Sequence, residues 1–354
     1  MIDDRQTSLK SSVNFEVGMA GDSERNSVPS AESLRELAPR MRDLRDRVFA
    51  EIGKVVVGMS EVTHQFLIAL LAGGHVLLEG VPGVAKTTLS KTFAYVLGTQ
   101  YQRLQFTPDL LPSDVTGTYV FDRKQNEFVL RKGPIFCQVL LADEVNRAPA
   151  KTQSALLEAM QENQVTIEGT TLPLPQPFMV LATQNPIEHE GVYRLPEAQL
   201  DRFLLRVTMG YPGRYDELAM LRLHSQPVAE VKQLFTAEQI LDIQWQVASV
   251  HGEDVLLEYI IDLAEASRTH PDLVLGASPR AALCLLRCAR ARALLDGRHY
   301  FTHEDVQAVA PNVLAHRLIV RPEAEVEGKQ ALDIIRELLD AVPVLETAPR
   351  KLRR

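Results

Sequence analysis

The 354-residue sequence has few cysteines and no long apolar run. Three cysteines are too few for the disulfide framework of a small secreted domain, and no stretch approaches the roughly 20 consecutive apolar residues of a membrane-spanning helix. The sequence also opens without the basic and then apolar pattern of a secretory signal. These absences predict a cytoplasmic protein with reduced thiols and no membrane span.

The sequence also has fewer basic than acidic residues: 38 lysine and arginine residues against 46 aspartate and glutamate residues, which gives a net charge of −8. That balance disfavours a general attraction to the phosphate backbone of nucleic acids. The mixture of 45% hydrophobic and 24% charged residues is ordinary for a globular protein, and the length suits two domains. We therefore expect two folded domains and no nucleic-acid partner.

The two ends of the sequence differ from the rest in composition. Residues 1–30 are rich in Ser, Asn, Asp and Gly and hold few apolar anchors, which predicts a disordered tail. A helical pattern begins near Ser33, which forms a capping-box signature with Glu36, while Pro39 predicts a kink or a frayed first turn. Residues 346–354 form a short basic tail.

Five short apolar segments follow the first helix, and helical stretches separate several of them. They are His75–Glu79, Tyr101–Phe106, Val139–Ala142, Phe178–Ala182 and Phe203–Thr208. Continuous runs of Val, Leu and Ile suit strands that are buried on both faces of a parallel sheet. Residues 31–210 are therefore predicted to form an α/β domain, with a five-stranded parallel sheet flanked by helices.

Past Pro212 the strand pattern ceases and amphipathic helices follow one another. The predicted helices span residues 236–249, 254–268, 279–295, 302–317 and 326–341. Three of them open on N-cap signals at Thr236, Ser278 and Thr302. Residues 211–345 are therefore predicted to form an all-α second domain.

A glycine-rich turn between the first predicted strand and a helix has the context of a phosphate-binding P-loop. Such a turn aims backbone N–H groups and the positive end of the helix at one point. Lys86 would reach the β- and γ-phosphates of ATP, and the Thr87 hydroxyl would bind Mg²⁺. Ala85 replaces the usual last glycine, so we expect a helical backbone there. The predicted nucleotide-binding residues are Gly80, Val81, Pro82, Gly83, Val84, Ala85, Lys86, Thr87 and Thr88.

Two acids, Asp143 and Glu144, end an apolar strand downstream of this loop. Carboxylates at the end of a buried strand are costly unless a cation or hydrogen-bond donors compensate them. Asp143 is predicted to hold Mg²⁺, and Glu144 to act as the general base that activates the attacking water.

Three further polar residues are candidates for contact with phosphate. Asn185 follows another apolar strand, and the ends of parallel strands converge on one crevice, so it should lie near Glu144. Arg202 precedes the fifth strand, where an arginine of a ring ATPase would face the γ-phosphate bound by the neighbouring subunit. Arg280 lies at a helix N-terminus, where its charge favours an anionic partner.

The ordered motifs Gly-Val-Pro-Gly-Val-Ala-Lys-Thr, Ala-Asp-Glu-Val-Asn-Arg, Ala-Thr-Gln-Asn-Pro, Leu-Asp-Arg-Phe and Ser-Pro-Arg-Ala resemble those of the MoxR family of AAA+ ATPases over about residues 35–340. The resemblance implies a P-loop AAA+ core with a helical lid, assembled as a homo-hexamer that binds ATP between subunits. It assigns Lys86 and Thr87 to Walker A, Asp143 and Glu144 to Walker B, Asn185 to sensor 1, Arg202 to the arginine finger and Arg280 to sensor 2.

Two insertions fit the same resemblance. Residues 106–134 hold a predicted hairpin, in which 119–121 pairs with 127–131, and look like a helix-two insert. Residues 164–174 form a second predicted hairpin with Glu168-Gly169 at its turn, like a pre-sensor-1 insertion. Both are hypothesised to line the pore of a ring and to contact substrate; plain surface hairpins are the alternative.

Three functions remain open from the sequence. The first is a chaperone-like ATPase that remodels or activates a protein substrate of unknown identity, and the resemblance implies a partner with a von Willebrand factor A domain. The second is the ATPase subunit of a metal chelatase, which shares the insertions. The third, a nucleic-acid motor, is disfavoured by the acidic charge and by the absence of an appended DNA-binding module.

Overall fold

The computed structural model describes residues 31–81, 83–184, 193, 195–225 and 229–344. Its centre is a five-stranded parallel sheet with the order β2-β5-β8-β1-β9. The strands are β1 (Val76–Gly80), β2 (Tyr101–Gln105), β5 (Val139–Asp143), β8 (Met179–Gln184) and β9 (Leu205–Met209). All five predicted strands are confirmed, and their carboxyl ends lie at one edge of the sheet because every pairing is parallel.

Side chains alternate between two apolar cores, one on each face of the sheet. Leu78 and Leu181 face the larger core, which includes residues of α1 (Ala31–Gly53), α2 (Ser60–Leu71) and α3 (Lys86–Val96). Leu77 and Val180 face the smaller core, which includes residues of α5 (Ala150–Glu162). Burial on both faces explains why these strands read as continuous apolar runs.

The first helix differs from its prediction at its start. Helix α1 begins at Ala31, two residues before Ser33, and continues through Pro39. The predicted capping box is therefore wrong, because Ser33 lies inside the helix. Leu34 and Met41 are buried on either side of the proline, and burial of this apolar stripe offsets the backbone hydrogen bond that Pro39 cannot donate.

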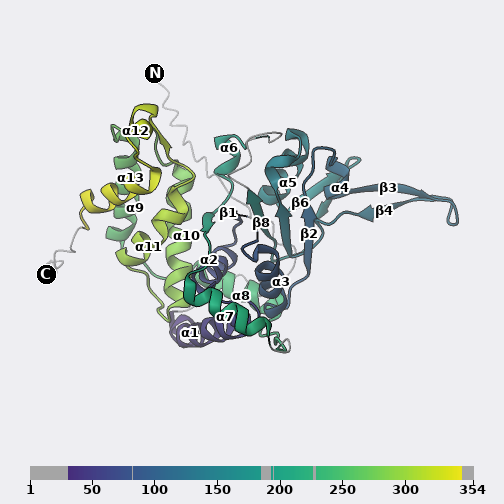
Figure 1. The fold of residues 1–354 in the computed structure, drawn as a ribbon, viewed down its shortest axis with the longest axis horizontal. Helices are drawn as coiled ribbons and strands as arrows, with labels where there is room; N and C mark the ends of the chain where they lie inside the picture. The colour runs from purple at the N-terminus through teal and green to yellow at the C-terminus, as the bar shows by residue number, and fades with distance from the viewer. Residues whose placement is uncertain (1–30, 82, 185–192, 194, 226–228, 345–354) are drawn as a thin grey trace, which may run out of the picture.

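Both predicted hairpins are confirmed. Strands β3 (Gly117–Asp122) and β4 (Glu127–Lys132) pair antiparallel after the short helix α4 (Pro112–Thr116), and Figure 1 shows this hairpin projecting away from the sheet. Strands β6 (Gln164–Ile167) and β7 (Thr170–Pro173) form the second hairpin.

The carboxyl-terminal part is helical, as predicted. Its helices are α7 (Arg214–His224), α8 (Ala237–Val247), α9 (Asp254–Thr269), α10 (Pro279–Leu295), α11 (His303–Leu314), α12 (Pro322–Val326) and α13 (Ala331–Ala341). Two details differ. A short antiparallel ladder joins β10 (Leu273–Leu275) to β11 (Ile319–Val320), strands too short to show a periodic pattern. The predicted helix 326–341 begins only at Ala331, because the backbone turns at Gly328 with φ +89°.

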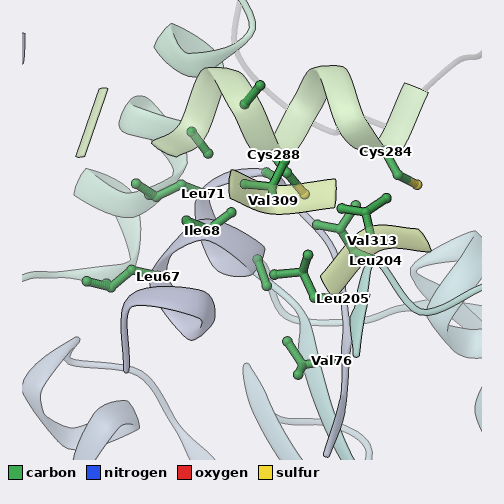
Figure 2. Packing of buried hydrophobic residues seen from close by; sticks show 14 of the residues in the cluster. Leu67, Ile68, Leu71, Val76, Leu204, Leu205, Cys284, Cys288, Val309 and Val313 are labelled. Atoms are coloured by element: carbon green, nitrogen blue, oxygen red, sulfur yellow. The ribbon is translucent and has the colours of Figure 1, made fainter. Parts of the chain in front are cut away.

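The helical part packs directly on the sheet. Figure 2 shows Leu67, Ile68 and Leu71 of α2 gathered with Cys284 and Cys288 of α10 and with Val309 and Val313 of α11. Leu204 and Leu205, at the start of β9, belong to the same buried cluster. One apolar core therefore connects the sheet to the helices that follow it.

Two further observations concern the cysteines and the hydrophobicity of the helices. Cys137, Cys284 and Cys288 are buried free thiols, and burial raises the pKa of Cys137 to about 12. Among the described helices, none is both long and apolar enough to cross a membrane.

His75 at the start of β1 is a buried histidine that stabilises the fold only when neutral. Its Nε2 lies 2.9 Å from the Met160 carbonyl oxygen, and its Nδ1 accepts the Val180 N–H at 3.0 Å, which requires the Nε2–H tautomer. Burial, with the nearby charges of Arg287 and Arg280, lowers the pKa of His75 to about 4.

The lowered pKa of His75 predicts a loss of stability in acid. Between pH 6.5 and pH 4 the unfolded chain binds a proton at this residue and the folded chain does not. The free energy of unfolding therefore decreases as the pH is lowered through this range, by on the order of 3 kcal/mol in total. Urea unfolding at pH 7.5 and pH 5 should show this loss, and His75→Gln should reduce it. An equal loss in both proteins would contradict the assignment.

Candidate active site

The loop between β1 and α3 depends on two glycines for different reasons. A Cβ on Gly80 would lie 2.5 Å from the Met209 carbonyl oxygen, so only glycine fits between the two strands. Gly83 has φ +84°, a left-handed conformation that glycine adopts without strain. Pro82 of the same predicted loop lies outside the described residues.

Ala85 is the clearest correction to the sequence analysis. Its backbone is left-handed, with φ 58° and ψ 23°, whereas a helical conformation was predicted. The helix begins one residue later, at Lys86, so the chain must still turn at Ala85 to enter it. A residue with a Cβ in this conformation costs about 1–2 kcal/mol, so the loop holds strain that a glycine would lack.

Replacing Ala85 by glycine should therefore leave the free energy of unfolding unchanged or raise it by up to about 1 kcal/mol, since relief of strain exceeds the added freedom of the unfolded chain. Ala155→Gly, inside α5, is the matched control and should lower it by about 1 kcal/mol. Urea unfolding measures both variants. Equal destabilisation by the two changes would show that Ala85 is not strained.

The first turn of α3 brings the lysine of the loop close to acidic residues. The Lys86 ammonium donates a hydrogen bond to the Gly80 carbonyl oxygen at 2.7 Å. Burial lowers the pKa of Lys86, and the charges of Asp143 and Glu144 oppose that shift. Thr87 is half-buried and Thr88 is exposed in the same turn. The ammonium of the loop therefore lies close to the two acids at the carboxyl end of β5.

Thr183 on β8 links the two acids. Its hydroxyl donates to Asp143 Oδ1 at 2.6 Å and accepts the backbone N–H of Glu144 at 2.8 Å. Glu144 itself is left-handed, with φ 57°, so the chain bends where the general base was predicted. Thr183 belongs to the motif that contains Asn185, but only Asn185 was singled out from the sequence. A hydroxyl at the end of an adjacent strand was the missed signal.

Residues of β2 and of the turn after β5 hold the outer oxygens of both acids. The Arg103 guanidinium donates to Asp143 Oδ2 at 2.7 Å. The Gln105 side-chain amide donates to Glu144 Oε2 at 2.6 Å, and Arg147 Nε lies 3.2 Å from the same oxygen. The contacts from Arg103 and Gln105 were not predicted, because they depend on β2 lying beside β5 in the sheet. The carboxylate of Glu144 is thus held in one orientation.

The oxygen donors at this site suit a magnesium ion. A hydroxyl on Thr87 and a carboxylate on Asp143 are the hard donors that Mg²⁺ prefers, beside the phosphate oxygens of a nucleotide. A carboxylate has about four acceptor positions, so Asp143 keeps capacity beyond its contacts with Thr183 and Arg103. The donor set therefore fits the predicted ion.

The remaining candidates lie away from the P-loop or outside the described chain. Asn185 falls outside the described residues. Arg202 is half-buried and lies two residues before Leu204, whose N–H donates to the His75 carbonyl oxygen at the amino end of β1. Arg280 is exposed, and its influence on the pKa of His75 places it near the same end. The P-loop lies at the opposite end of β1, so the two arginines are not gathered around the nucleotide site of their own chain.

Comparison with known proteins identifies the family. The ATPase family associated with various cellular activities (AAA) matches residues 75–205, and the AAA lid domain matches residues 265–338. A chain of a candidate ATPase from Cytophaga hutchinsonii superposes with a TM-score of 0.84 at 43% identity, covering 89% of this chain and 99% of that one.

Two curated relatives align over nearly the whole chain. The uncharacterized protein YeaC of Bacillus subtilis is 46% identical over 88% of this chain and 98% of its own length. Chaperone MoxR1 of Mycobacterium tuberculosis is 42% identical over 89% of this chain and 86% of its own. A magnesium-chelatase subunit of Arabidopsis thaliana is more distant, at 31% identity over 51% of this chain. The chain belongs to the MoxR family of AAA+ ATPases.

Proposed function

We propose that the protein is a Mg²⁺-dependent ATPase that works as a ring and remodels a partner protein. The observation that carries the hydrolytic part is the convergence of Lys86, Asp143 and Glu144 at one edge of the sheet, with Thr183 and Gln105 fixing the acids. A cation, a metal-binding carboxylate and an oriented base are the groups that phosphoryl transfer to water requires.

Each residue has a defined task in the proposed reaction. Backbone N–H groups of the loop and of the first turn of α3 bind the phosphates, and Lys86 exchanges the Gly80 carbonyl for a phosphate oxygen. Thr87 and Asp143 would hold Mg²⁺, which would neutralise charge on the phosphates when bound. Glu144 accepts the proton of the attacking water, while Gln105 orients its carboxylate and Thr183 holds its backbone N–H.

A ring would bring an arginine to each nucleotide site from the neighbouring subunit. Arg202 lies at the amino ends of the strands, and its guanidinium forms no hydrogen bond or ion pair with any described residue. An arginine so placed can neutralise the γ-phosphate only in a neighbouring subunit, with a head-to-tail contact that closes into a ring. Arg280, near the same end, would reach the same neighbour. We propose a homo-hexamer on this basis and by family resemblance.

The β3–β4 hairpin is the proposed contact with the partner. Val120, Phe121, Phe128 and Val129 are all exposed, between 40% and 69%, and they form two directly opposed cross-strand pairs. Apolar side chains on both faces of a projecting hairpin are costly to leave in water unless another surface covers them. A relative that carries the name chaperone, with family resemblance, supports a protein substrate and a partner with a von Willebrand factor A domain.

A metal-chelatase role is less well supported. The chelatase subunit aligns with about half of this chain, whereas the MoxR relatives align with nearly all of it. In the described residues, His270, Asp272 and Glu337 come together, but Lys329 bonds both carboxylates, so this cluster is an ion-pair network.

Shortening the β3–β4 hairpin tests the proposed function. Replacing residues 120–129 by Asn-Gly joins Tyr119 to Leu130, which are cross-strand partners, through a two-residue turn. Wild-type protein should hydrolyse ATP only with Mg²⁺. The variant should keep that basal rate within about twofold, because the hairpin lies outside the ATP site, yet should lose co-purification with the von Willebrand factor A domain protein of the same genome.

The matched control replaces only residues 123–126 by Asn-Gly, which shortens the turn and keeps the Phe121–Phe128 pair. This control should retain both the basal rate and the partner. Loss of the basal rate and of the partner together in the longer replacement would contradict a division of labour between site and hairpin. Absence of Mg²⁺-dependent hydrolysis in the wild type would overturn the proposal itself.

A further inference from the structure

A buried arginine of the helical part, Arg317, binds the segment that carries Arg202. Its side chain is only 2% exposed, although it lies just beyond the end of α11, 116 residues from Asp201. Burying a guanidinium costs free energy unless its donors are hydrogen-bonded, so the partners of Arg317 identify the segment that it stabilises.

Most donors of Arg317 reach the four residues that begin at Asp201. Its Nε donates to Asp201 Oδ1 at 2.7 Å, and Nη2 donates to the carbonyl oxygens of Phe203 at 2.6 Å and of Asp201 at 3.2 Å. Its Nη1 donates to the Leu204 carbonyl at 3.2 Å and to that of Val313. The guanidinium thus encloses the backbone on both sides of Arg202.

Two neighbours of Arg317 complete this contact. His316 is buried, and its Nε2 lies 3.1 Å from the Phe203 carbonyl oxygen, while burial and the Arg317 charge lower the pKa of His316 well below its usual range. Ser278, the N-cap of α10, lies 3.4 Å from Asp201 Oδ2. Residues 201–204 are therefore bonded to residues at the start of α10 and at the end of α11. Their bond to the sheet is the one that the Leu204 N–H donates to the His75 carbonyl oxygen.

We propose that Arg317 is a positioning residue that holds Arg202 toward the nucleotide of the neighbouring subunit and transmits movement of the helical part to that arginine. This inference rests on the proposed ring ATPase with Arg202 acting in trans. The Arg202 side chain has no hydrogen-bond or ion-pair partner among the described residues, so the backbone that Arg317 binds sets its position. The Ser278–Asp201 contact also links this segment to the first turn of α10, where Arg280 lies two residues beyond Ser278.

Arg317→Lys tests the proposal, because lysine keeps the charge but cannot span the acceptors that the planar guanidinium reaches. We expect the affinity of the variant for a fluorescent ATP analogue to stay within about twofold of wild type, since the P-loop is untouched. We expect its ATPase rate to be about 10- to 100-fold lower, since a small displacement of a catalytic group has that effect. Arg298→Lys is the matched control: Arg298 is bonded to Asp305 within the helical part and should stay within about twofold.

Mixing with a Lys86→Ala protein separates a finger defect from a folding defect. Lys86→Ala subunits lack their own site but present an intact Arg202, so mixed rings of Arg317→Lys and Lys86→Ala should regain activity to the extent that Arg202→Ala mixtures do. Two outcomes would overturn the role of Arg317 and leave the trans arrangement intact. One is wild-type activity of Arg317→Lys; the other is a loss of activity that mixing does not restore although it restores Arg202→Ala. No restoration for Arg202→Ala would overturn the trans arrangement and this inference with it.

A second variant covers the case in which Arg317→Lys does not fold. Asp201→Asn removes the paired charge but keeps the size of the side chain and one acceptor for Arg317 Nε. This variant should fold and should have about tenfold lower ATPase activity. Mixing it with Lys86→Ala protein should restore activity. Full activity of Asp201→Asn, or a loss that mixing leaves unchanged, would contradict a positioning role for this contact.

Discussion

Replacing Glu144 by glutamine should lower the rate of ATP hydrolysis by about 10²- to 10⁴-fold while ATP still binds. Glutamine keeps the shape of the side chain but cannot accept the proton of the attacking water. Lys86 and Asp143, the residues proposed to bind the phosphates and the metal, are unchanged in this variant. Single-turnover hydrolysis, measured beside the affinity for a fluorescent ATP analogue, separates the two effects.

The structure makes the Glu144 prediction sharper than the sequence does. Gln105 donates to Glu144 Oε2, so a glutamine at 144 still has the backbone contact to Thr183 but presents an amide in place of one carboxylate oxygen. Glu158→Gln on the exposed side of α5 is the matched control and should hydrolyse ATP at the wild-type rate. Comparable loss in both variants, or normal turnover in Glu144→Gln, would remove Glu144 from the role of base.

Loss of Gln105 should then lower the rate by a smaller factor than loss of Glu144, since the base would remain and only its orientation would relax. The reason is that the Gln105 amide only donates to the carboxylate, at 2.6 Å, and an amide cannot act as the base. Arg147, 3.2 Å from the same oxygen, retains part of the orientation.

The sequence was sufficient where a site residue lies at the end of its own strand. Gly80, Asp143 and Glu144 lie at or just after the end of an apolar strand, and Lys86 follows the loop after Gly80; because a parallel sheet brings such ends together, both the fold and this cluster could be predicted. The β3–β4 hairpin was predictable for a similar reason, because its pairing is local in sequence.

Contacts that depend on the order of strands could not be predicted in the same way. Thr183 meets Glu144 across 39 residues, and Gln105 meets it from the other side across another 39, because β5 lies between β8 and β2. Arg317 reaches Asp201 across 116 residues, through packing of the helical part. Ala85 failed for a different reason: a left-handed backbone at a residue with a Cβ opposes local preference.

Arg202→Ala should abolish most ATP hydrolysis, by about 10³- to 10⁵-fold, if this residue is the finger of a neighbouring site. The variant keeps its own P-loop and both acids, so ATP binding should persist. Its partial rescue by a second inactive protein is the stronger expectation. Lys86→Ala subunits cannot use their own site, yet each still offers Arg202 to a neighbour.

In rings formed at random from equal amounts of Arg202→Ala and Lys86→Ala protein, about one interface in four joins an intact P-loop to an intact finger. The mixture should therefore hydrolyse ATP at up to about a quarter of the wild-type rate, although each protein alone is inactive. Arg214→Ala, an exposed arginine at the start of α7, controls for loss of surface charge and should stay active. Rescue requires that two chains build one site, because neither variant can regain a missing group within its own chain; inactive mixtures that still form rings would place the essential arginine elsewhere.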